Sequence, residues 1–103
     1  MTAAAPARDA AVFVDRLQRA QEEMARQGIS LLIVGPSADL RYLLGYEGHL
    51  SERMSVLVLP ANGMPHCVVP GFEAALLAGQ RDLVEIVTWA ETENPAVKVA
   101  AIT

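Results

Sequence analysis

The sequence has few of the residues that build disulfides, metal sites or nucleic-acid interfaces. Its 103 residues include one cysteine and two histidines, so no internal disulfide can form and no histidine pair has a metal-binding spacing. The 8 basic residues are outnumbered by 12 acidic ones, and the net charge of −4 provides no basic surface for phosphate groups or anionic lipids. We therefore expect no metal site built by this chain, no nucleic-acid partner and no membrane partner.

Long apolar runs are also missing. Glycine, proline or a charged residue interrupts every hydrophobic stretch well before the roughly 18 residues that a membrane helix needs. The alanine-rich N-terminal segment lacks the apolar core of a secretory signal. These two absences predict a soluble, cytoplasmic protein.

Hydrophobic residues nevertheless make up 52% of the chain, which is enough for the folded core of one domain. Residues 1–11 are rich in alanine and predict a flexible tail, so residues 12–103 are expected to form the domain. Cys67 lies in an apolar run without a nearby cation, and we expect a buried, unreactive thiol there.

Hydrophobic periodicity predicts alternating helices and strands. Apolar side chains at spacings of three and four predict a first helix, and Gly28 ends it. Ser37 and Gly45 are the N-cap and the C-terminal stop of a short second helix, and Asn94 followed by Pro95 begins a last one. The expected elements are helix 12–27, strand 29–34, helix 38–44, strands 54–59 and 64–69, helix 72–78, strand 84–87 and a helix from residue 95 onward.

These elements predict a three-layer α/β fold with a mixed sheet. Strand 29–34 is a nearly continuous apolar run, typical of a strand covered on both faces, so we expect it in the centre of the sheet. The Asn-Gly turn predicts an antiparallel hairpin of strands 54–59 and 64–69 on one side. The helical link after it permits a parallel crossover to strand 84–87 on the other side. The last helix has no following strand to receive it, which favours a domain truncated at its C-terminus.

Segment 45–53, GYEGHLSER, is the most chemically varied part of the chain and is predicted to be an exposed loop. A Ser-His-Asp set can be assembled on paper around His49, but no Gly-x-Ser-x-Gly turn positions a nucleophile. Glu47 and Glu52 could act as an acid–base pair, but nothing in the local sequence buries them. We therefore predict no catalytic residue in this chain.

The stretch PSADLRYLLGY at residues 36–46 closely resembles the signature SPANIRYLTGF in the N-terminal domain of the creatinase, prolidase and aminopeptidase P family. The surroundings agree in order: the helix that ends at Gly28, the strand ISLLIV, the Glu-Arg pair at 52–53, the strand VLVLP, the Asn-Gly turn and VVPGFE. The resemblance covers residues 13–95. It departs from the signature at three positions, which are Asp39 for Asn, Leu44 for Thr and Tyr46 for Phe.

The resemblance implies a ribonuclease-H-like N-terminal domain that, in two-domain proteins, precedes a larger pita-bread domain with a dinuclear metal site. The implied function is that of the non-catalytic N-terminal domain of a proline-specific metallo-exopeptidase, an Xaa-Pro dipeptidase or aminopeptidase of peptidase family M24. Its implied tasks are subunit association and active-site access. A pair of divalent ions, Mn, Co or Zn, is expected in the absent catalytic domain, and no cofactor is expected in this chain.

Two alternatives stay open on the same resemblance. The chain can be the N-terminal domain of a creatinase-like amidinohydrolase, or a free-standing binding or dimerisation module of the same fold. Exposed apolar side chains would favour the dimerisation module. The candidates for such side chains are Leu50, Phe72 and Trp89.

The resemblance also implies a substrate-access loop, which in the family approaches the active-site entrance of a neighbouring subunit. The implied partners are therefore a second copy of the chain, in a homo-oligomer, and a proline-containing peptide at the neighbouring catalytic domain. The corresponding residues here are Tyr46, Glu47, His49 and Arg53. We expect Arg53 above all to meet a substrate carboxylate through a charge-assisted hydrogen bond. A surface salt bridge from Arg53 to Glu47 or Glu52 is the alternative.

Overall fold

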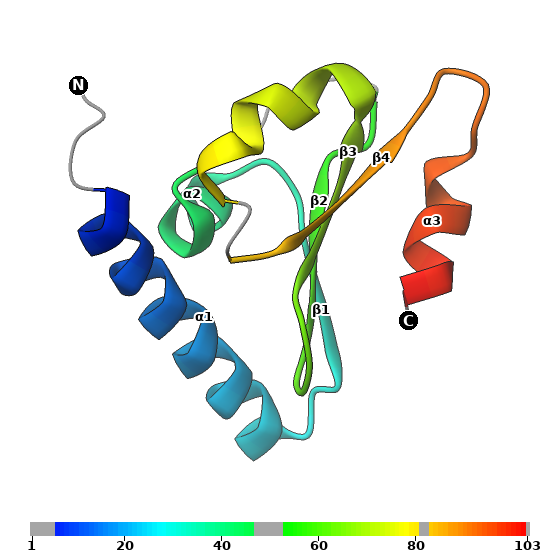
Figure 1. Ribbon diagram of the computed structural model, residues 1–103. Helices are drawn as coiled ribbons and strands as arrows, with labels where there is room; N and C mark the ends of the chain where they lie inside the picture. The colour runs from blue at the N-terminus through cyan, green and yellow to red at the C-terminus, as the bar shows by residue number, and fades with distance from the viewer. Residues whose placement is uncertain (1–5, 47–52, 81–82, 103) are drawn as a thin grey trace.

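The computed structural model describes residues 6–46, 53–80 and 83–102, and its helices and strands follow the predicted order (Figure 1). They are α1 (Pro6–Gln27), β1 (Leu31–Val34), α2 (Ala38–Leu44), β2 (Val56–Pro60), β3 (His66–Pro70), the 3₁₀ helix η1 (Gly71–Gln80), β4 (Glu85–Trp89) and α3 (Pro95–Ile102). Helix α1 begins at Pro6 rather than at residue 12, so residues 6–11 of the predicted tail are helical. Proline suits the first position of a helix, because the amide that it lacks has no partner there.

Four strands form one mixed sheet in the order β1-β2-β3-β4. β1 pairs antiparallel with β2, β2 and β3 form the predicted antiparallel hairpin, and β4 pairs parallel with β3. A parallel pair needs a crossover connection, and η1 lies within it. The mixed sheet, the hairpin and the parallel crossover are confirmed.

Helices cover both faces of this sheet, which confirms the three-layer α/β fold. α1, α2 and η1 lie on one face, and α3 lies on the other (Figure 1). The larger core cluster fills the first interface, and its buried members are Leu17, Met24, Leu40, Leu43, Leu44, Tyr46, Leu57, Leu59, Cys67, Val69, Leu77, Leu83 and Val84. A smaller cluster under α3 is built on Val58, Val68 and Trp89. The Cys67 side chain has no exposed surface, as predicted.

The prediction that strand 29–34 lies in the centre of the sheet is wrong. Among the described residues β1 pairs with β2 alone and forms an edge, where Leu32 is 37% exposed and Ile33 is 50% exposed. The centre is the hairpin instead, because its turn places β2 and β3 side by side and the crossover adds β4 next to β3. The two hairpin strands therefore separate β1 from β4.

Helix α2 begins and ends as predicted. The Ser37 hydroxyl accepts a hydrogen bond from the Leu40 amide at 3.2 Å, which is the usual N-cap contact. Gly45 ends the helix with a φ of +75°, and its amide donates to the Arg41 carbonyl at 2.8 Å. A Cβ at Gly45 would lie 2.8 Å from the Phe13 ring of α1. Both the backbone conformation and the close approach of α1 therefore require glycine at this position.

We predict that Gly45→Ala destabilises the domain more than Gly28→Ala does. Both glycines have a φ of +75°, so both variants lose about 1–2 kcal/mol to the left-handed conformation. Nothing lies within 4 Å of a Cβ at Gly28, whereas a Cβ at Gly45 meets Phe13, and this clash costs a further ~1–3 kcal/mol. Urea denaturation measures both free energies of unfolding. Equal losses in the two variants would contradict the close packing of Phe13 on Gly45.

Candidate functional site

The structure describes two of the four residues predicted for the access loop. Tyr46 directly follows α2, and Arg53 lies three residues before the first residue of β2. Glu47 and His49 lie outside the described residues. The described part of the site therefore consists of Tyr46 and Arg53, the residues on either side of segment 47–52.

Tyr46 belongs to the larger core cluster and is 8% exposed, so the prediction of an exposed loop is wrong at this residue. Its hydroxyl donates to Glu73 Oε2 of η1 at 2.6 Å and lies 3.2 Å from Ser55 Oγ. Glu73 and Ser55 are each 4% exposed. The burial follows from the end of α2, because an apolar residue after a left-handed glycine commonly packs back onto its helix.

Arg53 lies at the surface beside two residues that are distant in the sequence. Its Nε donates to Glu91 Oε2 at 2.7 Å, and the guanidinium lies 5.6 Å from the centre of the Phe72 ring. The Arg53 side chain is 47% exposed, and Phe72 is 66% exposed. The structure therefore places a cation and an aromatic ring side by side at the surface.

Sequence reasoning missed Glu91 as a salt-bridge partner of Arg53. The two residues are 38 positions apart, and no local spacing signals a contact over that distance. The partners that the sequence suggested, Glu47 and Glu52, lie outside the described residues. Glu91 follows β4 and therefore reaches Arg53 only through the fold of the sheet.

The three candidates for exposed apolar side chains have different outcomes. Phe72 is exposed, as predicted. Trp89 is 8% exposed, so its predicted exposure is wrong; its ring packs in the smaller core cluster and its Nε1 donates to the Met54 carbonyl at 2.9 Å. Leu50 lies outside the described residues.

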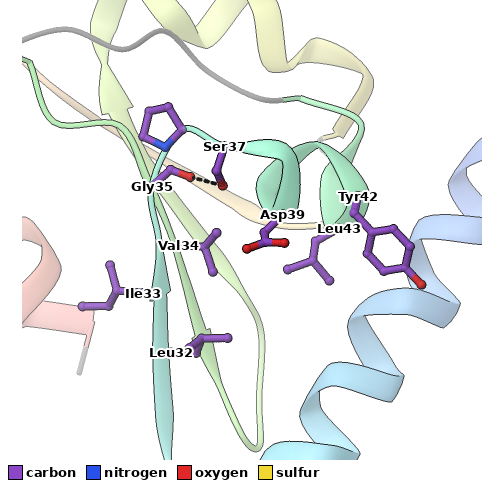
Figure 2. A pocket seen from close by; sticks show the side chains of 9 residues that line it. Leu32, Ile33, Val34, Gly35, Ser37, Asp39, Tyr42 and Leu43 are labelled. Atoms are coloured by element: carbon purple, nitrogen blue, oxygen red, sulfur yellow. Dashed lines mark hydrogen bonds between the residues drawn. The ribbon is translucent and has the colours of Figure 1, made fainter.

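A groove of about 510 Å³ lies along β1 and α2 (Figure 2). Its lining is mostly apolar, and Asp39 is the one carboxylate among the lining residues. The Ser37 hydroxyl at the end of the groove donates to the Gly35 carbonyl at 2.9 Å and also caps α2 (Figure 2). Because the Ser37 hydroxyl donates its proton to a backbone carbonyl and not to a general base, it is not an activated nucleophile.

The pKa values of two buried groups near Glu73 are raised. Burial is the main cause that raises the pKa of the Cys67 thiol to about 12, and the charge of Glu73 adds to it. Burial also raises the pKa of the Tyr46 phenol; the hydrogen bond to Glu73 raises it further, and the contact with Ser55 opposes both. Both groups therefore stay protonated at neutral pH, and neither acts there as a nucleophile or a base.

The donor set does not fit a dinuclear metal centre in the described part of the chain. Within residues 6–46, 53–80 and 83–102, no three His, Cys, Asp or Glu side chains come together, whereas a protein-built site needs several convergent ligands. Over the same residues, no helix is both long and apolar enough to cross a membrane.

Fold and site together define a small three-layer α/β domain that contains a buried Tyr-Glu contact and a surface Arg-Phe pair. The sequence profile of the creatinase/prolidase N-terminal domain family matches residues 16–102. The chain belongs to this family.

Individual relatives agree with this assignment. The chain is 35% identical over 97 residues to the probable dipeptidase PepE of Mycobacterium tuberculosis, and the match covers 91% of the chain and 26% of the relative. The crystal structure of dipeptidase PepE from Mycobacterium ulcerans has a TM-score of 0.84 at 38% identity, over 90% of this chain and 26% of that one. The crystal structure of recombinant prolidase from Thermococcus sibiricus has a TM-score of 0.76 at 27% identity, and the match covers 84% of this chain and 23% of that one. The chain thus spans about a quarter of the length of these relatives.

We predict that the stability of the domain falls as the pH rises above about 9. The Cys67 thiol has an ordinary pKa of 9.0 and a folded pKa of about 12, so the unfolded chain loses a proton that the folded chain keeps. The free energy of unfolding then decreases with pH in this window, by at most about 1.4 kcal/mol per pH unit. Urea denaturation from about pH 8 to 10 measures the slope, which Cys67→Ala should reduce. Identical slopes in both proteins would contradict the raised pKa of Cys67.

Proposed function

We propose that the chain is the non-catalytic N-terminal domain of a proline-specific metallo-exopeptidase, an Xaa-Pro dipeptidase or aminopeptidase, of cytoplasmic location. Family membership supports this proposal, and relatives named dipeptidase and prolidase favour a peptidase over a creatinase-like amidinohydrolase. The chain spans 26% of the PepE relative. The proposal therefore assigns the catalytic groups and a pair of divalent ions, Mn, Co or Zn, to a second domain.

The proposed role in active-site access rests mainly on the position of Arg53. Its half-exposed guanidinium lies beside the exposed ring of Phe72. A guanidinium binds a carboxylate through two parallel hydrogen bonds, and an aromatic ring provides an apolar surface for a proline ring or a neighbouring side chain. In this proposal Arg53, together with Glu47 and His49, meets a proline-containing peptide at the catalytic domain of a neighbouring subunit.

Glu91 is a partner of Arg53 in the substrate-free chain under this proposal. A solvent-exposed salt bridge contributes only about 0–1 kcal/mol, so a substrate carboxylate in a less solvated place can replace Glu91. Arg53 then supplies binding and orientation, and the chain performs no bond-breaking step.

Exposed apolar side chains support the proposed subunit association. Ile33 on the β1 edge is 50% exposed, Phe72 is 66% exposed and Val97 on α3 is 63% exposed. Open strand edges and exposed apolar side chains are typical of surfaces that bind another chain. We therefore propose a homo-oligomer in which such surfaces are covered.

In the full-length enzyme that the proposal requires, Arg53→Ala should raise KM for short Xaa-Pro substrates about tenfold or more. A hydrogen bond to a charged group contributes about 1.5–3 kcal/mol, which corresponds to such a factor in binding. The kcat stays close to the wild-type value, because Arg53 does not act on the scissile bond. His49→Ala should raise KM in the same way. Steady-state kinetics measure both constants.

Two further variants separate substrate binding from the surface salt bridge. Lys98→Ala is the matched control, because Lys98 also forms a partly exposed pair, with Glu93 at 3.0 Å, and its KM should not change. Glu91→Gln removes the surface partner of Arg53 but keeps the guanidinium, so its KM should stay constant or fall. If Glu91→Gln raised KM as much as Arg53→Ala, or if both loop variants kept kcat and KM, the domain would have a purely structural role.

The proposed association predicts dimers or larger oligomers of the chain in solution. Sedimentation velocity over a wide concentration range measures the oligomeric state. Ile33→Lys places a charge on the β1 edge and should shift the equilibrium toward the monomer if this edge takes part. A monomer at every concentration would refute the proposed association of this chain.

A further inference from the structure

Three polar side chains meet inside the larger core cluster, beside the two ends of segment 47–52. Tyr46 Oη lies 2.6 Å from Glu73 Oε2 and 3.2 Å from Ser55 Oγ. All three residues are buried, with an exposed fraction of 8% for Tyr46 and 4% for the other two. Tyr46 precedes the segment in the sequence, Ser55 follows it, and Glu73 belongs to η1. We call these residues the polar trio.

The direction of the hydrogen bonds follows from donor capacity. A phenol has one proton to donate, and the Tyr46 hydroxyl donates it to Glu73 Oε2. The contact between the two hydroxyl groups then requires Ser55 to donate to Tyr46 Oη. The trio is therefore a directed chain of hydrogen bonds from Ser55 through Tyr46 to Glu73.

Packing alone does not explain a carboxylate at this place. Removing a carboxylate from water is unfavourable by several kcal/mol unless hydrogen bonds and charges offset the loss. The other members of the core cluster are apolar, and Leu44 and Leu77 have no exposed surface. Replacing buried charged groups by apolar side chains of similar volume is often neutral or stabilising. The polar trio adds a specific link between Tyr46 and Ser55, which lie on either side of segment 47–52.

The covalent chain connects the trio to both surface groups of the proposed site. Phe72 is the sequence neighbour of Glu73, and Arg53 lies two residues before Ser55. The Arg53 guanidinium and the Phe72 ring are 5.6 Å apart. A displacement of Glu73 relative to Ser55 would therefore move the ring and the cation relative to each other.

We propose that Glu73 is a positioning residue, which through Tyr46 and Ser55 holds the two ends of segment 47–52 together and sets the place of Arg53 against Phe72. Glu73 touches no substrate in this scheme and acts through Arg53. The substrate role rests on the proposed function of Arg53. The link between the two ends of segment 47–52 can be measured without an activity assay.

Hydrogen–deuterium exchange of the full 103-residue chain tests this link. Tyr46→Phe removes only the hydroxyl at the centre of the trio, and Tyr42→Phe is the matched control, because Tyr42 is 55% exposed and is not part of the trio. We expect the amides of residues 46 and 53–55 to exchange about tenfold faster in Tyr46→Phe, since one lost hydrogen bond lowers the free energy of local opening by an amount that corresponds to that factor. Amides of α1 and β3 should keep their wild-type rates. Unchanged exchange in Tyr46→Phe, or faster exchange spread evenly over the chain, would overturn the proposal.

Two variants of Glu73 test the role of its carboxylate. Glu73→Gln keeps an acceptor for the Tyr46 hydroxyl, so exchange at residues 46 and 53–55 should stay near the wild-type rate. Glu73→Leu removes the acceptor and should accelerate exchange as Tyr46→Phe does. Urea denaturation shows whether Glu73→Leu still folds. If it does not, the comparison of Tyr46→Phe with Glu73→Gln alone tests the link. Equal exchange at residues 46 and 53–55 in Glu73→Gln and Tyr46→Phe would refute a link through this hydrogen bond.

Kinetics of the full-length enzyme test whether Glu73 acts through Arg53. Tyr46→Phe should raise KM several-fold at constant kcat, and this effect should disappear when Arg53 is already alanine, because the two changes then affect one interaction. If Arg53→Ala raises KM and Tyr46→Phe does not, the positioning role is overturned and the proposed function stands. If Arg53→Ala leaves KM unchanged, the proposed function fails and the substrate role of Glu73 fails with it, whatever the exchange measurements show.

Discussion

Gly45 determines where the candidate site begins. Its left-handed backbone ends α2, and Phe13 of α1 packs so close to it that no Cβ fits between them. The next residue, Tyr46, then enters the core, where its hydroxyl reaches Glu73. The contact between α1 and α2 thus fixes the place of Tyr46, and the hydrogen bond from its hydroxyl to Glu73 of η1 adds a polar contact there. Every later feature of the site depends on this turn.

The sequence predicted the helices and strands well because each one is encoded by residues that are close together. Ser37 and Gly45 mark the ends of α2, and an Asn-Gly turn marks the hairpin of β2 and β3. The order of the strands depends instead on pairing between distant segments, which hydrophobic periodicity does not describe. An apolar run such as strand 29–34 suits a central strand and an edge strand equally, and its true place becomes visible only in the exposure of Ile33.

The candidate site was predicted in part for the same reason. Arg53 could be singled out from the sequence, but its contacts Glu91 and Phe72 come to it through the fold. Tyr46 was visible as a departure from the Phe of the family signature, yet its meaning was missed, since a buried hydroxyl needs a polar partner. That partner, Glu73, is 27 residues away. Local sequence patterns therefore identified Arg53 and Tyr46 but did not predict which distant residues they contact.

Two buried groups among the described residues are unsuited to bond cleavage at neutral pH. Tyr46 and Cys67 are buried groups whose pKa values are raised, so they offer no base at neutral pH. A cation at the surface can still contribute, because binding energy from groups remote from the scissile bond orients a substrate for attack. Such a contribution requires accurate placement, since an error of about 1 Å can reduce a rate by about a hundredfold. Under the proposed positioning role, the buried Glu73 carboxylate provides this placement, because its contacts with Tyr46 and, through it, Ser55 join the segments that carry Arg53 and Phe72.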